Sequence, residues 1–131
     1  MAWPEVYLAL LISHLAGDFL LQTEWQATHK RGGLRGDPER RRALLLHGIT
    51  YTAAYVPALI WLGSEIGAHA AVACALAITL PHVIIDDGWV LFAWMSHVKH
   101  NDKPETWLVA AVDQTFHLVC LLPVAVVAAT A

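Results

Sequence analysis

Residues 68–94 read AHAAVACALAITLPHVIIDDGWVLFAW, and this stretch decides the fold. It is mostly apolar over more than the ~20 residues that a helix needs to cross the hydrocarbon core of a bilayer. Within it His82 and Asp86 stand four residues apart, so the two side chains share one face of a helix, about 6 Å apart along its axis. The stretch therefore predicts a transmembrane helix that carries a polar pair inside an apolar sequence.

Three other blocks of the chain are long and apolar enough to span a membrane, at residues 3–22, 43–62 and 105–130. Hydrophobic residues make up 57% of the chain, against roughly 45–50% in soluble domains, and the mean hydropathy is +0.51. We therefore expect an all-α integral membrane protein. Residues 1–131 should form a single domain, a compact four-transmembrane-helix bundle.

The connections between these helices differ sharply in basic residues. The loop at residues 95–104 carries Lys99 and Lys103, and the connection at residues 63–67 carries none. The loop at residues 23–42 carries six: Lys30, Arg31, Arg35, Arg40, Arg41 and Arg42. By the positive-inside rule the two basic loops face the cytoplasm. Both termini are then expected on the outer side of the membrane.

Two further histidine and aspartate pairs share the four-residue spacing. His14 precedes Asp18, whereas Asp113 precedes His117, so the order of the last pair is reversed. Because successive helices cross the membrane in opposite directions, the reversal brings all three histidines to one depth and all three aspartates to another. The sequence thus predicts a polar His/Asp core in the cytoplasmic half of the bundle.

The helix at residues 43–62 completes both layers, since His47 enters at the aspartate depth and Tyr51 reaches the histidine depth. An aspartate near the bilayer centre costs ~2.5–3.5 kcal/mol on the lenient insertion scale, so the three aspartates must face inward and find partners. The net charge is −3, and no lysine or arginine lies deep in any expected helix. The counter-charge is therefore expected from protons, protonated histidine or metal cations.

Imidazole and carboxylate together suit a divalent metal, with zinc as the expected ion and iron or manganese as alternatives. One arrangement has a single ion held by the histidines, with the aspartates orienting the rings. The other has two ions that share the whole set, and we favour this second arrangement. The predicted metal ligands are His14, Asp18, His47, His82, Asp86, Asp113 and His117.

Neighbouring polar residues have expected roles in binding or catalysis. Asp18 and Asp113 are the expected catalytic carboxylates, and Tyr51 is expected to donate a hydrogen bond to a developing oxyanion. Gln22 and Gln114 flank the core, where they would position a substrate or hydrogen-bond between helices. Three arginines either bind an anionic headgroup or serve only the membrane topology. They are Arg40, Arg41 and Arg42.

Two residues at helix ends bear on the boundaries of the core. Asp87 points about 100° away from Asp86 on a helix, and it is an extra ligand, a partner for a loop lysine or a proton relay. Asp37 before Pro38 predicts an N-cap followed by proline at the first helical position. The helix at residues 43–62 should therefore begin before it enters lipid.

The segment HLAGDFLLQT at residues 14–23 resembles the opening motif of a bacterial family of short membrane proteins, the domain-of-unknown-function family three-three-zero-seven. The resemblance continues in Leu46-His47 with Tyr51, in HVIID at residues 82–86 and in DQTFHL at residues 113–118. It implies a compact bundle in the bacterial inner membrane and names no reaction. It also implies a lysine one turn after the third motif, where this chain has Gly88-Trp89-Val90.

The leading hypothesis is a metal-dependent hydrolase, embedded in the membrane, that acts on a lipid or lipid-linked phosphate at the cytoplasmic leaflet. The rival is a proton or divalent-cation transporter or channel, because ionisable residues within lipid mark such pathways equally well. A haem-binding bundle and a purely structural one are further alternatives. The outer halves of the helices are apolar, which favours a one-sided site. Expected partners are the bilayer and an anionic lipid headgroup, with a homo-oligomer left open and no nucleic acid.

Overall fold

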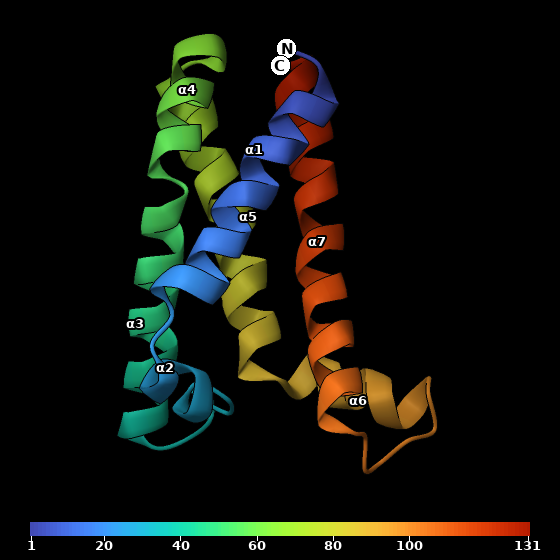
Figure 1. Cartoon of the computed structure of the whole chain (residues 1–131). Coiled ribbons are helices and arrows are strands. Elements are labelled where there is room, and N and C mark those ends of the chain that lie inside the picture. The colour runs from blue at the N-terminus through green and yellow to red at the C-terminus, as the bar shows by residue number, and fades with distance from the viewer.

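The computed structural model describes residues 1–131 and consists of helices joined by short connections. Both termini and the α4–α5 connection lie at one end of the molecule, here called the terminal end (Figure 1). The opposite end carries the two long loops and is called the loop end. In chain order the elements are α1 (Trp3–Leu15), the π-helix η1 (Ala16–Leu21), α2 (Glu24–His29), α3 (Pro38–Ala54), α4 (Val56–Ile66), α5 (Ala68–Asp87), α6 (Trp89–His97) and α7 (Thr106–Thr130).

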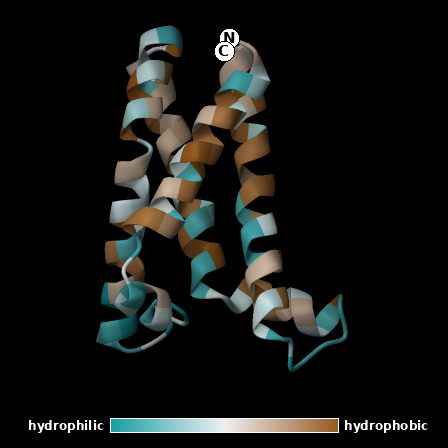
Figure 2. Ribbon diagram, in the orientation of Figure 1, coloured by the Kyte–Doolittle hydropathy of each residue, from teal (hydrophilic) through white to brown (hydrophobic).

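Three helical segments are long and apolar enough to cross a membrane: Trp3–Leu21, Ala68–Asp87 and Thr106–Thr130. The pair α3 and α4 meets the same test as one span bent by 54°. Large apolar side chains cover the outer faces, among them Leu20 at 80% and Ile60 at 70% exposed, which soluble monomers rarely show over so wide an area. Figure 2 shows hydrophilic residues gathered at the loop end and apolar ones along the helices. The expectation of an all-helical protein with apolar spans is confirmed.

The prediction of one helix over residues 68–94 is wrong at its C-terminal end. α5 stops at Asp87, because Gly88 adopts the left-handed conformation with φ 88° and caps the helix. Glycine takes this conformation without the steric penalty that a Cβ atom brings. The chain then turns sideways into α6, which lies across the loop end rather than extending α5 (Figure 1). Asp86 and Asp87 thus stand in the last turn of the span.

The prediction of a single helix over residues 43–62 is also wrong, because two helices, α3 and α4, cover this segment and meet at Tyr55 with a 54° bend. Pro57 lies in the first turn of α4. Its ring would clash with the carbonyl of Ala53 in a continuous helix, and it has no N–H to donate. The bend carries α4 toward α5, against which it packs.

Residues 23–42, expected as a loop, contain α2 and the first turn of α3. Thr23 begins α2 with a capping box, in which its hydroxyl accepts from the Gln26 backbone amide at 3.2 Å and the Gln26 side chain accepts from the Thr23 amide at 2.9 Å. Asp37 caps α3, because its Oδ1 accepts from the backbone N–H of Arg40 at 3.0 Å. The predicted N-cap is therefore confirmed.

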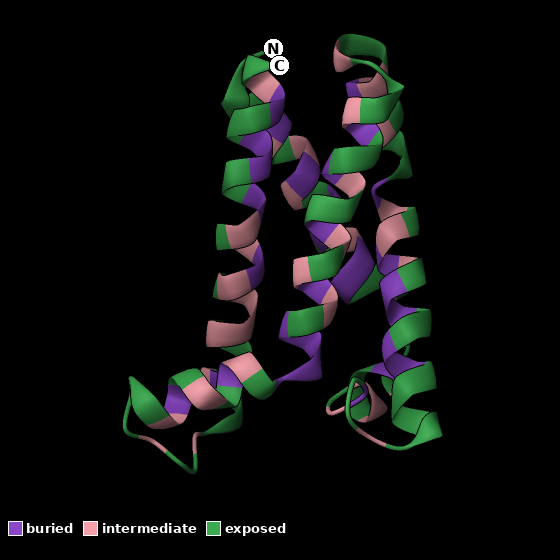
Figure 3. Ribbon diagram, turned by 180° about the vertical axis from the view of Figure 1, so that it is seen from behind, coloured by how far each residue is buried: buried purple, intermediate pink, exposed green.

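The bundle core divides into an apolar and a polar part. α1 packs mainly against α7, and α5 lies between α4 and α7 (Figure 1). Buried positions follow the inward faces of these helices (Figure 3). The apolar cluster consists of Val6, Leu10, Tyr51, Tyr55, Ala58, Leu62, Cys74, Ile78, Leu121, Val124, Ala125 and Ala128. Nearer the loop end, buried histidines and aspartates replace these apolar residues.

Candidate metal centre

The polar core draws its side chains from four segments of the chain. η1 supplies Asp18, α3 supplies His47, α5 supplies His82 and Asp86, and α7 supplies His117. All five residues are buried, with the exposed fraction at 7% or less. The sequence argument that buried aspartates and histidines must converge inside the bundle therefore agrees with the structure.

The π-helix is what brings Asp18 to this core. A π-helical turn is wider than an α-helical one and is found frequently at functional sites, where it redirects a side chain. Gly17 lies against α3 so closely that a Cβ atom there would stand 2.7 Å from Cδ2 of Tyr51. Glycine at this position thus permits the close approach of η1 to α3, and Asp18 Oδ1 lies 3.3 Å from His47 Nε2.

The Nε2 atoms of His47 and His82 form the middle of the cluster, 3.1 Å apart. Asp86 Oδ2 lies 2.9 Å from His47 Nε2 and 3.0 Å from His82 Nε2. On the other side, Asp18 Oδ1 lies 3.3 Å from His47 Nε2 and 3.9 Å from His82 Nε2. Ligand atoms 2.0–2.1 Å from a tetrahedral ion stand about 3.3 Å from one another. The distances from the two Nε2 atoms to either carboxylate oxygen therefore suit the coordination shell of a small cation.

Several polar atoms of this cluster lack hydrogen-bond partners although they are buried. They are Asp18 Oδ1, Asp86 Oδ2, Nδ1 of His47 and His82, and His117 Nε2, whereas Asp86 Oδ1 forms an ion pair. Buried polar atoms without partners are rare, because each loses its hydration without compensation. Two carboxylates and two imidazole nitrogens that face one another are the donor set of a metal site, and the residues present fit a divalent cation.

His117 extends the cluster toward α7. Its Nδ1 lies 2.9 Å from the backbone carbonyl of Asp113, an arrangement in which Nδ1 donates and Nε2 keeps its lone pair. That Nε2 lies 3.6 Å from Asp86 Oδ1. Two overlapping groups can thus hold an ion: Asp18, His47 and His82, and His82, Asp86 and His117.

The other two predicted ligands, His14 and Asp113, belong to neither group. Both ring nitrogens of His14 have partners, since Nδ1 lies 3.1 Å from the Tyr51 hydroxyl and Nε2 lies 2.9 Å from Gln114 Oε1. Asp113 lies at the edge, with a side chain 15% exposed and its Oδ2 3.7 Å from His117 Nδ1. These two residues flank the cluster rather than complete it.

Tyr51 supports the imidazole of His82. The two rings stack with centroids 3.4 Å apart and an interplanar angle of 5°. The Tyr51 hydroxyl contacts His14 and, at 2.6 Å, the hydroxyl of Tyr55. Because the hydroxyl already has these partners, the geometry gives no support to the expected role of Tyr51 as an oxyanion donor.

The two glutamines expected to meet a substrate hold the aspartates and their neighbours. Gln114 donates from Nε2 to Asp18 Oδ2 at 3.2 Å. With its amide oxygen turned toward Lys30, Gln22 accepts from the ammonium at 2.8 Å and donates to the backbone carbonyl of Asp18 at 3.1 Å. The interhelical alternative is therefore what the structure shows for Gln114.

The three arginines at the start of α3 are exposed and do not reach the cluster. Arg40 lies 3.5 Å from Asp37, and the Arg42 guanidinium lies over the ring of Trp25 at 5.9 Å. Arg41 has no ion-pair partner. These residues form a basic surface at the loop end, apart from the buried carboxylates.

The expectation that the counter-charge comes only from protons, protonated histidine or metal cations is wrong, because a loop lysine also supplies it. Lys30, from the end of α2, places its Nζ 2.8 Å from Asp86 Oδ1, and its side chain is only 11% exposed. Its loop is attached to Asp87, whose backbone carbonyl accepts from Gly32 at 2.8 Å and whose Oδ1 accepts from the Leu34 amide at 2.7 Å. Asp87 is thus a partner for the loop, although through backbone amides rather than a lysine. The sequence signals for a cation here are the loop lysine suggested as a partner for Asp87 and the lysine implied after the third motif.

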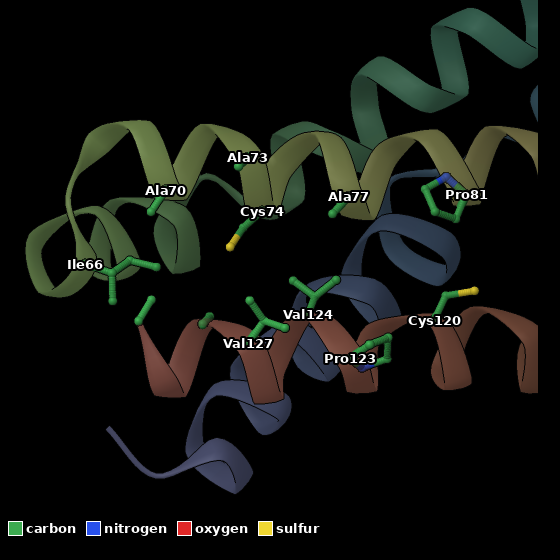
Figure 4. A pocket seen from close by; sticks show the side chains of 12 residues that line it. Ile66, Ala70, Ala73, Cys74, Ala77, Pro81, Cys120, Pro123, Val124 and Val127 are labelled. Atoms are coloured by element: carbon green, nitrogen blue, oxygen red, sulfur yellow. The ribbon is translucent and has the colours of Figure 1, made fainter.

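An apolar crevice of about 460 Å³ runs between α5 and α7. Its wall extends from Ile66 and Ala131 at the terminal end to Pro81 and Cys120 (Figure 4). Pro81 directly precedes His82, and Cys120 follows His117 by three residues. The crevice therefore ends beside the helical segments that carry the cluster.

Comparison with known proteins places the chain in a family. The family model described as "Protein of unknown function (DUF3307)" matches residues 6–131, which include every residue of the cluster. No curated protein and no solved structure matches the chain. With nearly its whole length covered, the chain belongs to the family described as "Protein of unknown function (DUF3307)".

Proposed function

We propose that this protein is a metal-dependent hydrolase of the bacterial inner membrane, acting on a lipid or lipid-linked phosphate at the cytoplasmic leaflet. The observation that carries the proposal is the convergence of Asp18 Oδ1 and Asp86 Oδ2, at 2.9–3.9 Å, on the Nε2 atoms of His47 and His82, which lie 3.1 Å apart. Zinc is the expected ion, and iron or manganese would accept the same donors. A divalent cation offsets the charge of carboxylates that are otherwise costly to bury.

When bound, a divalent cation would supply two things: a water made acidic enough to ionise near neutral pH, and polarisation of a phosphoryl oxygen. The chain's own residues prepare the site for this chemistry. Gln114 donates to Asp18 Oδ2, which leaves Oδ1 facing the imidazoles. The stacked ring of Tyr51 fixes the plane of His82. Asp113, whose side chain is the most exposed of the three carboxylates, would accept a proton at the edge of the site.

A lipid substrate is supported by the apolar crevice between α5 and α7. Along α5 it extends from Pro81 to Ala70, and eleven residues of helix correspond to roughly 16 Å. This is about half of the ~30 Å hydrocarbon thickness, and the crevice runs from the level of the cluster toward the terminal end. An acyl chain in the crevice would leave the phosphate at the level of the cluster.

The orientation follows from charge. The basic residues of the 23–42 and 95–104 loops lie at the loop end, so the positive-inside rule directs this end to the cytoplasm. Basic residues at a membrane surface attract acidic lipids by about 1 kcal/mol each. The exposed arginines at the start of α3 would therefore concentrate anionic lipid near the site.

Two alternatives receive less support. Transport through one chain requires a polar path, but buried Leu10, Leu62 and Ala125 fill the bundle on the terminal side of the cluster. A haem with two axial histidines requires the macrocycle between them, whereas His47 and His82 place their Nε2 atoms 3.1 Å apart. A one-sided site for a small cation fits this geometry better.

Elemental analysis of protein purified in detergent without chelators tests the proposal. We expect stoichiometric divalent metal in the wild type, in Asp113→Ala and in the control His69→Ala, whose side chain is exposed at the terminal end. His82→Ala should lose the metal. Phosphate release from a lipid phosphomonoester in mixed micelles should require the metal and fall in Asp113→Ala.

The possible results test the metal site, its ligands and the hydrolase separately. Wild-type protein without stoichiometric metal overturns the metal site, and full metal in His82→Ala overturns the ligand assignment. A metal-loaded protein that releases no phosphate from any lipid or lipid-linked phosphate overturns the hydrolase.

A further inference from the structure

Lys30 is the only lysine or arginine in contact with the buried carboxylates. Its Nζ lies 2.8 Å from Asp86 Oδ1 and within 2.8 Å of Gln22 when that amide is turned toward it. The side chain is 11% exposed, whereas the Asp86 side chain is fully buried. A lysine gives up much of its hydration in such a place, which is favourable only beside an opposite charge.

The two oxygens of Asp86 face different partners. Oδ2 faces the Nε2 atoms of His47 and His82 at 2.9 and 3.0 Å. Oδ1 faces the Lys30 ammonium and His117 Nε2, the latter at 3.6 Å. In two-metal sites the ions stand ~3.5–4 Å apart, and a carboxylate between them gives one oxygen to each. The Lys30 ammonium therefore lies where a second ion would contact Asp86.

Charge balance gives the same result. The cluster contains three carboxylates, from Asp18, Asp86 and Asp113, and one ammonium, from Lys30. One divalent cation together with this ammonium balances the three negative charges. A second divalent cation would leave two uncompensated positive charges in a medium of low dielectric constant, where such an excess is strongly unfavourable.

The loop that follows Lys30 is held in place, so the ammonium is positioned in advance. Gly32, with φ 77°, donates its amide to the Asp87 carbonyl, and Leu34 donates to the Asp87 carboxylate. The Arg31 guanidinium lies 5.4 Å from the centre of the Phe92 ring on α6. Gly33 packs so tightly that a Cβ atom would stand 2.7 Å from the Arg40 carbonyl.

We infer that Lys30 is the built-in second cation of a mononuclear centre. The chain then holds one divalent ion between His47 and His82, instead of the two ions that the residue count had favoured. The Lys30 ammonium takes the second position beside Asp86 and, with the ion, faces the phosphate oxygens of the headgroup. This inference rests on the proposed metal-dependent function and adds the number of ions and the residue that sets it.

Metal stoichiometry tests the inference without an activity assay. The wild type, Lys30→Met, Lys30→Arg and the exposed-loop control Lys99→Met are saturated with zinc, freed of excess by gel filtration in detergent, and analysed for zinc and protein. We expect one ion per chain in the wild type, Lys30→Arg and Lys99→Met, and two in Lys30→Met. Asp87→Ala, which releases the loop while keeping Lys30, provides a second variant and should also bind more than one ion.

The failures are distinguishable. No zinc in any protein overturns the proposed function and this inference together. Two ions in the wild type, or one ion in both Lys30→Met and Asp87→Ala, overturn the inference alone and leave the metal-dependent function standing.

Discussion

Replacing Gly17 with alanine tests how closely η1 must approach α3. The new Cβ atom would stand 2.7 Å from Tyr51 Cδ2 and 3.3 Å from Tyr51 Cα. The ring cannot turn aside freely, because it stacks on His82 and its hydroxyl contacts His14 and Tyr55. The helices must therefore separate, and overpacking of this kind costs about 1–3 kcal/mol. We expect Gly17→Ala to lower the free energy of unfolding by that amount in denaturant titrations of the detergent-solubilised protein.

Gly63→Ala is the matched control for this substitution. Its Cβ atom would meet Ala71 Cβ at 3.6 Å, an ordinary van der Waals contact. Since alanine is roughly 0.5–1 kcal/mol better than glycine inside a helix, Gly63→Ala should be as stable as the wild type or slightly more stable. If Gly17→Ala proves as stable as Gly63→Ala, the close contact between η1 and α3 is not what holds Asp18 beside His47.

Three further substitutions have expected outcomes. Asp87→Ala leaves the Leu34 amide without its acceptor and should cost about 1 kcal/mol, with faster tryptic cleavage in the adjoining loop; unchanged cleavage would contradict the attachment. The hydrogen bond from the Arg40 amide holds the pKa of Asp37 below its usual value of 3.8. The N-cap of α3 is therefore fully present at pH values above 3.8 and is lost as the pH falls through the lowered pKa. Amide exchange at Arg40, corrected for its intrinsic pH dependence, should rise over that interval, whereas in Asp37→Asn it should not change there. Thr79→Val removes the 2.8 Å hydrogen bond between the hydroxyls of Thr79 on α5 and Thr52 on α3. It should lower the free energy of unfolding by roughly 0.6 kcal/mol in denaturant titrations. A loss of more than about 2 kcal/mol would show that removing this bond also disturbs other contacts.

The polar core could be foreseen from the sequence because lipid leaves few choices. Aspartates within apolar helices must face inward, and the reversed order of Asp113 and His117 fits helices that cross in alternate directions. His47 consequently lies among the carboxylates, and Tyr51 lies against the ring of His82, as the depth argument expects. The apolar lengths likewise identified four segments without any structural information.

The helix ends and the number of cations were harder to foresee. Apolar composition continues past Gly88, so only the left-handed glycine marks the end of α5. Lys30 reaches Asp86 because two backbone amides of its loop bind Asp87, and such contacts depend on how the chain folds back rather than on side-chain type. A lysine in a basic loop is usually solvated, so charge pattern alone assigned it to topology. The position of Lys30 beside Asp86 also lowers the expected number of ions from two to one.

X-ray absorption at the zinc edge of the zinc-loaded protein tests the metal centre most directly. The account predicts only nitrogen and oxygen scatterers at about 2.0–2.1 Å, with the multiple-scattering pattern of two imidazoles, and loss of that pattern in His82→Ala. Sulfur at about 2.3 Å would instead place the ion at Cys74 or Cys120 in the crevice. That result, or a shell without imidazole, would contradict a centre built on His47 and His82.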